Sequence, residues 1–166
     1  MSFFRSDSVR KFEKISFEQF KKDIKDDKEL YESYSLPKRG TKCAAGYDFY
    51  AIYDYTLKPG EIMKIPTGVK VCMESDDVLF LLDRSSMGFK YNVRLTNQVG
   101  VIDADYYNNS SNEGHMWIRI QNEGDKDYVV KKGEGIIQGI FIKYLKTDDD
   151  IESEETRNGG FGSTNK

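Results

Sequence analysis

The sequence predicts an all-β fold, a jelly-roll β-sandwich or barrel with a short N-terminal helix and an extended C-terminal arm. Short apolar or alternating runs recur from Leu36 onward, and Gly-containing turns separate them. This pattern stops after Leu145, where acidic residues take over. Many short strands joined by hairpin turns are typical of sandwiches and jelly rolls. The chain of 166 residues has the length of about one domain.

Changes in composition divide this single domain into three parts. Residues 1–35 are interpreted as an N-terminal extension with a short helix, and residues 36–146 as the jelly-roll core. Residues 147–166 are interpreted as an acidic linker followed by a Gly-rich C-terminal arm. No internal repeat is found in the sequence.

The N-terminal helix is predicted from a capping signal and an apolar face. Ser16-Phe17-Glu18-Gln19 has the form of a capping box. Phe17, Phe20 and Ile24 then share one helix face. We therefore expect a short helix over residues 17–26, with the charged opposite face solvated and without a chemical role.

The core is predicted from runs that are short, apolar or alternating, as antiparallel strands are. Turn residues lie between them, as in Lys58-Pro59-Gly60-Glu61, where Pro holds the second turn position and Gly the third. Asn122–Asp125 and Lys131–Glu134 are similar Gly-containing turns. The predicted strands are Ile62–Pro66, Val69–Met73, Val78–Leu82, Tyr91–Leu95, Met116–Gln121, Tyr128–Val130 and Ile136–Leu145.

The C-terminal segment is too acidic to pack on a core. Thr147 to Glu155 is dominated by Asp and Glu, and the residues that follow are rich in Gly. Composition alone would make this a flexible tail. Arg157 and Phe161 argue against a pure spacer, since a spacer needs neither a cation nor an aromatic ring. We interpret the segment as an extended arm.

Charge and cysteine content exclude several classes of function. Lys plus Arg total 25 against 28 Asp plus Glu, so no positive excess attracts a nucleic-acid backbone. Two cysteines are too few for a secreted disulfide framework or a four-ligand zinc site. No signal peptide or membrane span is expected, because charge interrupts the N-terminus and no apolar run is long enough. We expect a cytoplasmic protein without membrane or direct nucleic-acid binding.

The residues available for chemistry favour carboxylate catalysis. His115 is the only histidine and lies in a polar loop, so we expect it to be solvated and without a catalytic role. This disfavours Ser-His and Cys-His nucleophilic mechanisms. The apolar run Gly100–Ile102 ends in Asp103, Asp105 and Tyr106. Together with the Gly-rich arm, these residues suggest a site for a charged, planar ligand, with water activated by a carboxylate and a hard divalent ion.

Five separated segments then carry a resemblance to one family. They are Ala45–Ala51, Arg84–Gly88, Gly100–Tyr106, Gly133–Gln138 and Gly159–Thr164. In order and approximate spacing they resemble the motifs of the trimeric dUTPase family, over about Leu36 to Lys166. The resemblance implies three jelly-roll subunits with active sites at their interfaces, each closed by the C-terminal arm of a neighbouring subunit. It also implies hydrolysis of dUTP to dUMP and diphosphate by attack of water on the α-phosphorus.

The third segment matches the family's base, sugar and catalytic positions. Asp103 matches the general base that activates water. Tyr106 matches the tyrosine beneath the deoxyribose, where a ribose 2′-hydroxyl would collide, and Asp105 is a supporting neighbour. Asn97 matches a residue of the uracil hairpin, where a polar edge rejects cytosine through unpaired donors and acceptors.

The other segments match the family's phosphate-binding groups. Arg84 and Ser85 match the donors of the second segment, and Ser86 is counted with them although it stands at a frequent glycine position. Gln138 matches the phosphate-contacting glutamine. Asp48 matches an aspartate tied to the metal-water and interface network. Mg²⁺ is the implied cofactor, held through phosphates and water and without direct protein ligands.

The arm supplies the last group of implied contacts. Phe161 matches the ring that stacks on uracil, while Gly162, Ser163 and Arg157 would engage the phosphates. Arg157 stands one residue nearer the Gly-Gly-Phe sequence than in many members. The segment after Tyr106 also departs from the pattern, because Asn108 replaces a usual glycine and the loop that follows is longer. Gly135 replaces a frequent arginine, which removes a cation or a structural ion pair.

Two alternatives stay open at the level of sequence. The fold could serve as a catalytically silent regulatory or structural binding module, since architecture alone does not dictate activity. Retention of Asp103, Tyr106, Gln138 and Phe161 favours the enzyme. A dCTP deaminase shares the general jelly roll, but its catalytic-glutamate pattern is not seen in this sequence.

Overall fold

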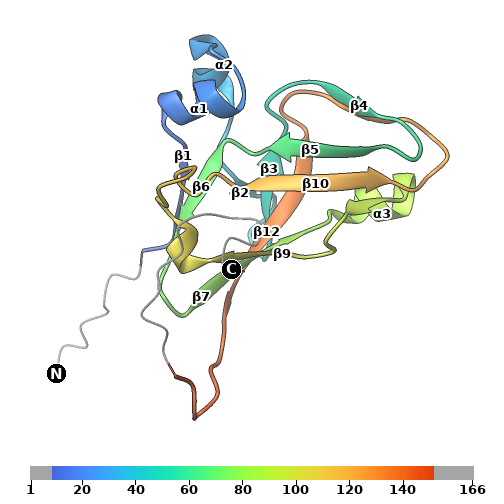
Figure 1. Cartoon of the computed structure of the whole chain (residues 1–166). Helices are drawn as coiled ribbons and strands as arrows, with labels where there is room; N and C mark the ends of the chain where they lie inside the picture. The colour runs from blue at the N-terminus through green and yellow to red at the C-terminus, as the bar shows by residue number, and fades with distance from the viewer. Residues whose placement is uncertain (1–8, 152–166) are drawn as a thin grey trace.

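The largest sheet contains five antiparallel strands in the order β2-β3-β12-β7-β9 (Figure 1). It belongs to a computed structural model that describes residues 9–151 of the chain. Strand β7 lies between β12 and β9, and its apolar sequence is buried along most of its length. The bounds are β2 Lys38–Arg39, β3 Tyr47–Tyr50, β7 Asp77–Leu82, β9 Gly100–Asp103 and β12 Gly135–Lys143.

A second, three-stranded sheet with the order β5-β10-β8 contributes the other side of the core. Apolar side chains from both sheets, such as Phe49, Leu79, Leu95 and Ile120, meet in one buried cluster. The prediction of an all-β fold is therefore confirmed. The bounds are β5 Ile62–Pro66, β8 Val93–Leu95 and β10 Trp117–Asn122, with the antiparallel pairs β1 Lys11–Lys14 with β6 Val69–Cys72 and β4 Tyr55–Leu57 with β11 Tyr128–Val130.

Two predicted turns have the geometry that their glycines allow. The amide of Glu61 donates to the carbonyl of Lys58 at 3.0 Å, and Gly60 has a φ of 81°. The turn from Lys131 to Glu134 repeats this arrangement, with the same bond at 3.0 Å and Gly133 at a φ of 84°. A positive φ at the third turn position defines a type II turn and favours glycine there. Both turn predictions are confirmed.

The N-terminal extension contains two short helices where one longer helix was expected. Helix α1 spans Phe17–Asp23, and helix α2 spans Lys28–Ser33. The capping signal is confirmed, since the Ser16 side chain accepts a hydrogen bond from the Gln19 amide. The predicted end at residue 26 is wrong because the Asp27 side chain accepts from the Leu30 amide and begins a new helix.

Helix α3, Ser85–Tyr91, occupies a segment whose last residue was predicted to begin a strand. The strand, β8, begins only at Val93. Between them Asn92 has a φ of 53°, and its amide bonds the carbonyls of the last helical turn. Asparagine tolerates this left-handed conformation better than most residues and commonly ends helices. Asn92 therefore sets the boundary between helix and strand.

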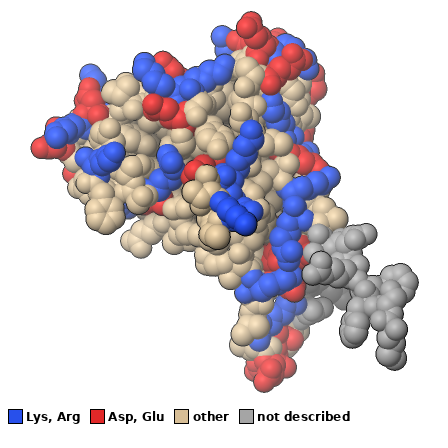
Figure 2. Space-filling model, turned by 180° about the vertical axis from the view of Figure 1, so that it is seen from behind, with Lys and Arg blue, Asp and Glu red and all other residues tan. Residues whose placement is uncertain are grey.

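The surface matches the mixed composition of the sequence. Figure 2 shows basic and acidic side chains sharing one face of the molecule, in keeping with a formal net charge of −3. Within residues 9–151, no helix is long and apolar enough to cross a bilayer.

A buried carboxylate fixes the end of β7 that lies next to the last residues of β9. The Asp77 side chain is 1% exposed and lies 2.6 Å from Arg10 Nε and 3.1 Å from Lys143 Nζ. It also accepts the Glu74 amide at 3.1 Å. Burial raises the pKa of Asp77, but the hydrogen bonds from Arg10, Lys143 and Glu74 outweigh it and hold the pKa below the ordinary aspartate value.

We predict that Asp77→Ala lowers the free energy of unfolding by about 2–4 kcal/mol near neutral pH, because several donors lose a buried acceptor. A carboxyl with a depressed pKa stabilises the fold above its unfolded pKa of about 4, and this contribution is lost as the pH falls toward the folded pKa. Urea unfolding should therefore show that the difference in the free energy of unfolding between wild type and variant becomes smaller below about pH 4. A difference that stays constant down to about pH 3 would contradict this role.

Candidate functional site

The first cluster of candidate residues is assembled by strand register. Asp48 on β3, Gln138 on β12 and Leu82 on β7 occupy one row across the sheet. Arg84 follows β7, and its Nε donates to Asp48 Oδ1 at 3.0 Å while Nη1 donates to the Gly135 carbonyl at 2.9 Å. The sheet therefore brings together the first, second and fourth motif segments, which are far apart in the sequence.

Asp83 joins this cluster and was not singled out in the sequence. Gln138 Nε2 donates to the Asp83 carbonyl at 2.8 Å, and the Asp83 carboxylate accepts the Leu95 amide at 2.9 Å. Burial raises the pKa of Asp83, opposed by the Leu95 hydrogen bond and the charge of Arg94. The only sequence signal that indicated Asp83 is its position directly before the segment that begins at Arg84.

A cavity of about 310 Å³ lies beside Arg84. Ser86 lines this cavity, whereas Ser85, the first residue of α3, is exposed. Lys90 adds a second cation to the lining, and Glu134 adds a carboxylate. Guanidinium, ammonium and hydroxyl donors in one hollow are chemically suited to phosphate oxygens. The arrangement fits the phosphate role that the second segment implies.

The second cluster lies where β9 ends. Asp103 is the last residue of β9 and is half-buried, and the one-turn helix η1, Ala104–Tyr106, follows it directly. The Tyr106 side chain is 6% exposed. Its hydroxyl donates to the His115 carbonyl at 3.0 Å and accepts from Asn112 Nδ2 at 2.8 Å. Asp105 lies between them and is exposed.

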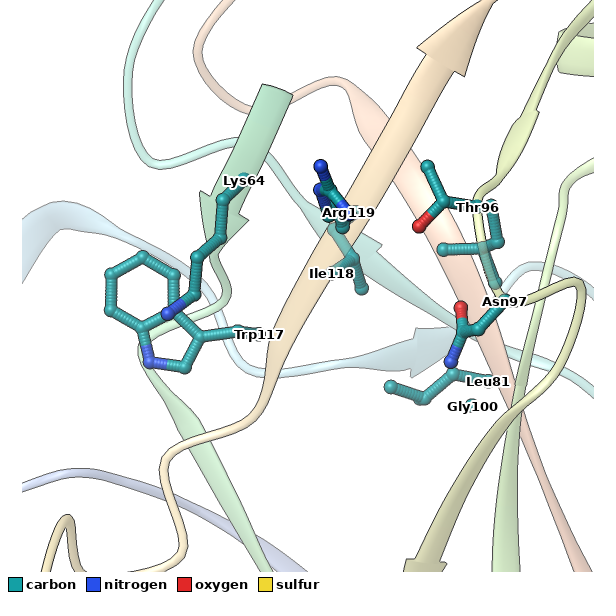
Figure 3. A pocket seen from close by; sticks show the side chains of 9 residues that line it. Lys64, Leu81, Thr96, Asn97, Gly100, Trp117, Ile118 and Arg119 are labelled. Atoms are coloured by element: carbon teal, nitrogen blue, oxygen red, sulfur yellow. The ribbon is translucent and has the colours of Figure 1, made fainter. Parts of the chain in front are cut away.

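A cavity of about 290 Å³ opens where β8 and β9 diverge toward different sheets. Asn97 and Gly100 line it on the hairpin side, and Leu81 of β7 lines it as well (Figure 3). Trp117 and Arg119 of β10 complete the wall, and Lys64 Nζ lies 4.3 Å from the centre of the Trp117 ring. The cavity is large enough for one planar base, with apolar walls and a few polar groups, as small-ligand sites usually have.

The sequence analysis found Asn97 but missed the β10 wall of this cavity. Trp117 is the only tryptophan of the chain, and it directly follows the loop between η1 and β10. A single large aromatic residue at the start of a strand was the only sequence signal that Trp117 could line a ligand site. Its contribution to the cavity depends on which strands diverge, which the sequence does not state.

One chain does not bring the two clusters together. Asp103 pairs with Val78 at the start of β7, whereas Arg84 follows the opposite end of the same strand. At about 3.3 Å per residue, the two side chains are about 20 Å apart along β7. Figure 1 shows η1 and α3 on opposite sides of the molecule. A site that uses both clusters therefore has to be built from more than one copy of the chain.

Comparison with known proteins identifies the family. The dUTPase family model matches residues 32–165. The chain belongs to the dUTPase family. A deoxyuridine 5'-triphosphate nucleotidohydrolase of Lactococcus lactis subsp. lactis is 48% identical over 131 residues, covering 78% of this chain and 87% of that protein. A nucleotidohydrolase of the same name from Desulfitobacterium hafniense is 37% identical over 136 residues, covering 78% of this chain and 86% of that protein.

A solved structure gives the same result for the fold. The crystal structure of dUTPase from Streptococcus mutans matches with a TM-score of 0.67 and 40% identity, covering 82% of this chain and 98% of that chain. The resemblance seen in the sequence and the jelly-roll class are thereby confirmed. The chain is an enzyme of dUTP hydrolysis, which decides against the silent module and the deaminase.

Two departures from the dUTPase pattern have a structural explanation. Asn108, at a usual glycine position, has a φ of 55°, and its side chain accepts from Lys70 Nζ at 2.8 Å. Asparagine thus maintains the left-handed backbone that glycine would provide. At Gly135, a Cβ would collide with the guanidinium of Arg84, so Arg84 occupies the space of the missing side chain. The ion pair of Arg84 with Asp48 supplies a cation at this point.

The expectation that His115 is solvated is wrong. The residue is 0% exposed, and its Nδ1 lies 2.6 Å from Asp23 Oδ2. Its loop is also ordered by side chains, since Asn109 is buried and accepts two backbone amides of the same loop. A polar loop sequence does not reveal this burial because the partner, Asp23, lies 92 residues away.

Some candidate residues fall outside the described part of the chain. Arg157, Phe161, Gly162 and Ser163 of the arm lie beyond residue 151. Among residues 9–151, no group of three or more His, Cys, Asp or Glu side chains is placed to hold a metal ion.

We predict that Gly46→Ala lowers kcat/KM for dUTP about tenfold with little change in thermal stability. A Cβ at Gly46 would collide with the amide oxygen of Gln138, whose flexible side chain would turn away from Asp83. Steady-state kinetics and thermal unfolding measure the two effects. Gly40→Ala is the matched control, since its Cβ would lie in ordinary contact, 3.6 Å from Asp48 Oδ2. Equal kinetics for both variants would exclude the proposed importance of the Gln138 position.

Proposed function

We propose that this enzyme converts dUTP to dUMP and diphosphate, with Asp103 as the general base. Asp103 takes a proton from a water molecule, whose oxygen attacks the α-phosphorus. The bond from that phosphorus to the oxygen shared with the β-phosphate breaks, and diphosphate leaves. A carboxylate is suited to this role because a rigid strand end can hold it in line with the reacting water. The half-buried position of Asp103 at the end of β9 supports the assignment.

The base and sugar of the substrate are assigned to the same subunit as Asp103. The cavity beside Asn97 and Gly100 takes the uracil, whose polar edge pairs with the hairpin. β9 runs from Gly100 to Asp103, so a nucleoside lying along this strand places its sugar near Tyr106. Tyr106 is held by two hydrogen bonds of its hydroxyl, and a ring fixed in this way can exclude a ribose 2′-hydroxyl.

The triphosphate is assigned to a neighbouring subunit. Arg84, Ser85, Ser86 and Gln138 supply the donors there, and Asp48 supports Arg84. The observation that carries this proposal is the strand register, which places Asp103 and Arg84 at opposite ends of β7, a separation of about 20 Å at the usual rise per residue. A homotrimer with its active sites between subunits satisfies this constraint, as cyclic assemblies repeat one interface.

The arm completes each site in this proposal. Phe161 stacks on the uracil, and Arg157, Gly162 and Ser163 contact the phosphates of a site on another subunit. The acidic stretch that begins at residue 147 has the composition of a hydrated linker, which suits a Gly-rich end that must reach a neighbouring site.

Mg²⁺ is the proposed cofactor, and the residues present fit a metal held by the substrate. Residues 9–151 offer no group of three potential ligand side chains, so phosphate oxygens and water would supply most of the coordination. Asp48, which the resemblance ties to the metal-water network, forms an ion pair with Arg84. When bound, the metal neutralises phosphate charge and favours departure of diphosphate.

In the cell, the reaction limits the incorporation of uracil into DNA and supplies dUMP for the synthesis of dTMP. Both roles suit the cytoplasmic location that the sequence suggests.

We predict that the purified protein with Mg²⁺ releases diphosphate from dUTP far faster than from UTP, dCTP or dTTP, and that a chelator suppresses the reaction. Asp103→Asn should lower kcat by about 10² to 10⁴ with little effect on KM, because it removes the base and keeps the shape of the side chain. A coupled diphosphate assay measures both effects. An unchanged kcat would reject Asp103 as the base, and equal turnover of all four nucleotides would reject the base and sugar assignments.

A further inference from the structure

Helix α1 is fastened at both ends to the loop that follows the catalytic segment. At its start, the Ser16 amide donates to Glu113 Oε2 at 2.9 Å, and the Ser16 hydroxyl donates to the other carboxylate oxygen. At its end, Asp23 Oδ2 lies 2.6 Å from His115 Nδ1. The residues of α1 precede residue 32, where the match to the dUTPase family model begins. On the α1 side, this fastening therefore comes from residues that precede the segment matched by the family model.

His115 has the hydrogen-bond partners of a neutral imidazole. The Gly68 amide donates to Nε2 at 2.9 Å, so Nε2 is the acceptor. The ring proton is then on Nδ1 and is donated to Asp23. Burial lowers the pKa of His115, opposed by the hydrogen bond to Asp23. Gly68 and Asp23, one at each ring nitrogen, together fix the tautomer and the orientation of the ring.

The same residue contacts both parts of the nucleoside site. The His115 carbonyl accepts the Tyr106 hydroxyl at 3.0 Å, and it also accepts Asn112 Nδ2 at 3.2 Å. The His115 ring lies 4.9 Å, centre to centre, from the ring of Trp117, which lines the base cavity. A shift of His115 would therefore reach the sugar-facing tyrosine through the backbone and the cavity wall through the ring.

We propose that Asp23 is a positioning residue for nucleoside recognition, which holds Tyr106 and Trp117 in place through His115. The inference rests on the proposed function, because it assigns Tyr106 to the sugar and the cavity to the base. Its specific consequence is that the N-terminal extension sharpens the preference for deoxyribose over ribose. A displacement of Tyr106 or Trp117 by about 1 Å is enough to weaken this preference, since a misplacement of that size can cost a large factor in rate.

The extension has a separate anchor that does not depend on Asp23. Phe20 is 0% exposed and stacks on Tyr34 with ring centres 5.7 Å apart. The Tyr34 hydroxyl donates to the Gly68 carbonyl at 2.7 Å in the interior. These contacts keep α1 docked when the Asp23 carboxylate is removed, so Asp23 variants are expected to fold.

The test compares dUTP with UTP in Asp23→Ala, Asp23→Asn and the wild type. The ratio of kcat/KM for dUTP to that for UTP should fall about tenfold in Asp23→Ala. It should fall about threefold in Asp23→Asn, whose amide oxygen still accepts from His115 without a charge. Asp26→Ala is the matched control, an exposed carboxylate three residues beyond Asp23, and should keep the wild-type ratio.

Binding of dUMP and UMP, followed by the fluorescence of Trp117, the only tryptophan, gives the same comparison without turnover. Folded Asp23 variants with the wild-type preference in both assays would overturn the inference while the proposed function stands. If Asp23→Ala does not fold, an unchanged ratio in Asp23→Asn overturns it. A wild-type protein that neither hydrolyses dUTP nor binds dUMP would reject the proposed function and this inference together.

Discussion

The antiparallel register of β7 is the constraint on which the functional geometry depends. β7 pairs with β12, and β12 pairs with β3 on its other side, which places Asp48 and Gln138 in the row that ends next to Arg84. Pairing of the same strand with β9 places Asp103 at the other end. Because a strand is stiff and its hydrogen bonds fix the register, the chain cannot bring these two groups together by bending locally. Separation of the proposed catalytic base from the proposed phosphate donors is therefore built into the core, and under the proposed function association of subunits becomes a condition for catalysis.

The two ends of the strand are supported in different ways. At the phosphate end, the support is electrostatic and local, with Arg84 held by Asp48 and by the carbonyl of Gly135. At the end of β7 next to Asp103, support comes from distant parts of the chain. Asp77 ties β7 to the residues that precede β1, and the α1 helix holds the loop after Tyr106. The extension thus supports the end of the sheet to which the nucleoside is assigned in the proposed function.

Local sequence signals predicted the parts of this structure that depend on few residues. The turns at Gly60 and Gly133 follow from the positive φ that glycine allows, and most strands follow from alternating burial. The start of α1 follows from its capping serine. The motif segments also singled out Asp48 and Gln138, which the sheet joins in one row next to Arg84.

The features that the sequence did not reveal depend on long-range contacts. His115 is typical of a solvated loop until Asp23 and Gly68 are placed around it. Trp117 becomes a cavity wall only because β8 and β9 separate into different sheets. The second helix was missed because its start depends on one side-chain cap at Asp27, with little apolar periodicity to follow.

Subunit complementation tests the composite site most directly. Asp103→Asn and Arg84→Ala proteins would be mixed in equal amounts, dissociated and reassembled, and assayed with dUTP and Mg²⁺. A site shared between neighbouring subunits should regain about a quarter of the wild-type activity, because about one interface in four then combines two intact groups. A mixture of Arg84→Ala with Gln138→Ala, which damage the same cluster, should regain none. Activity no greater than that of the separate parents in the first mixture would show that each chain carries a complete site.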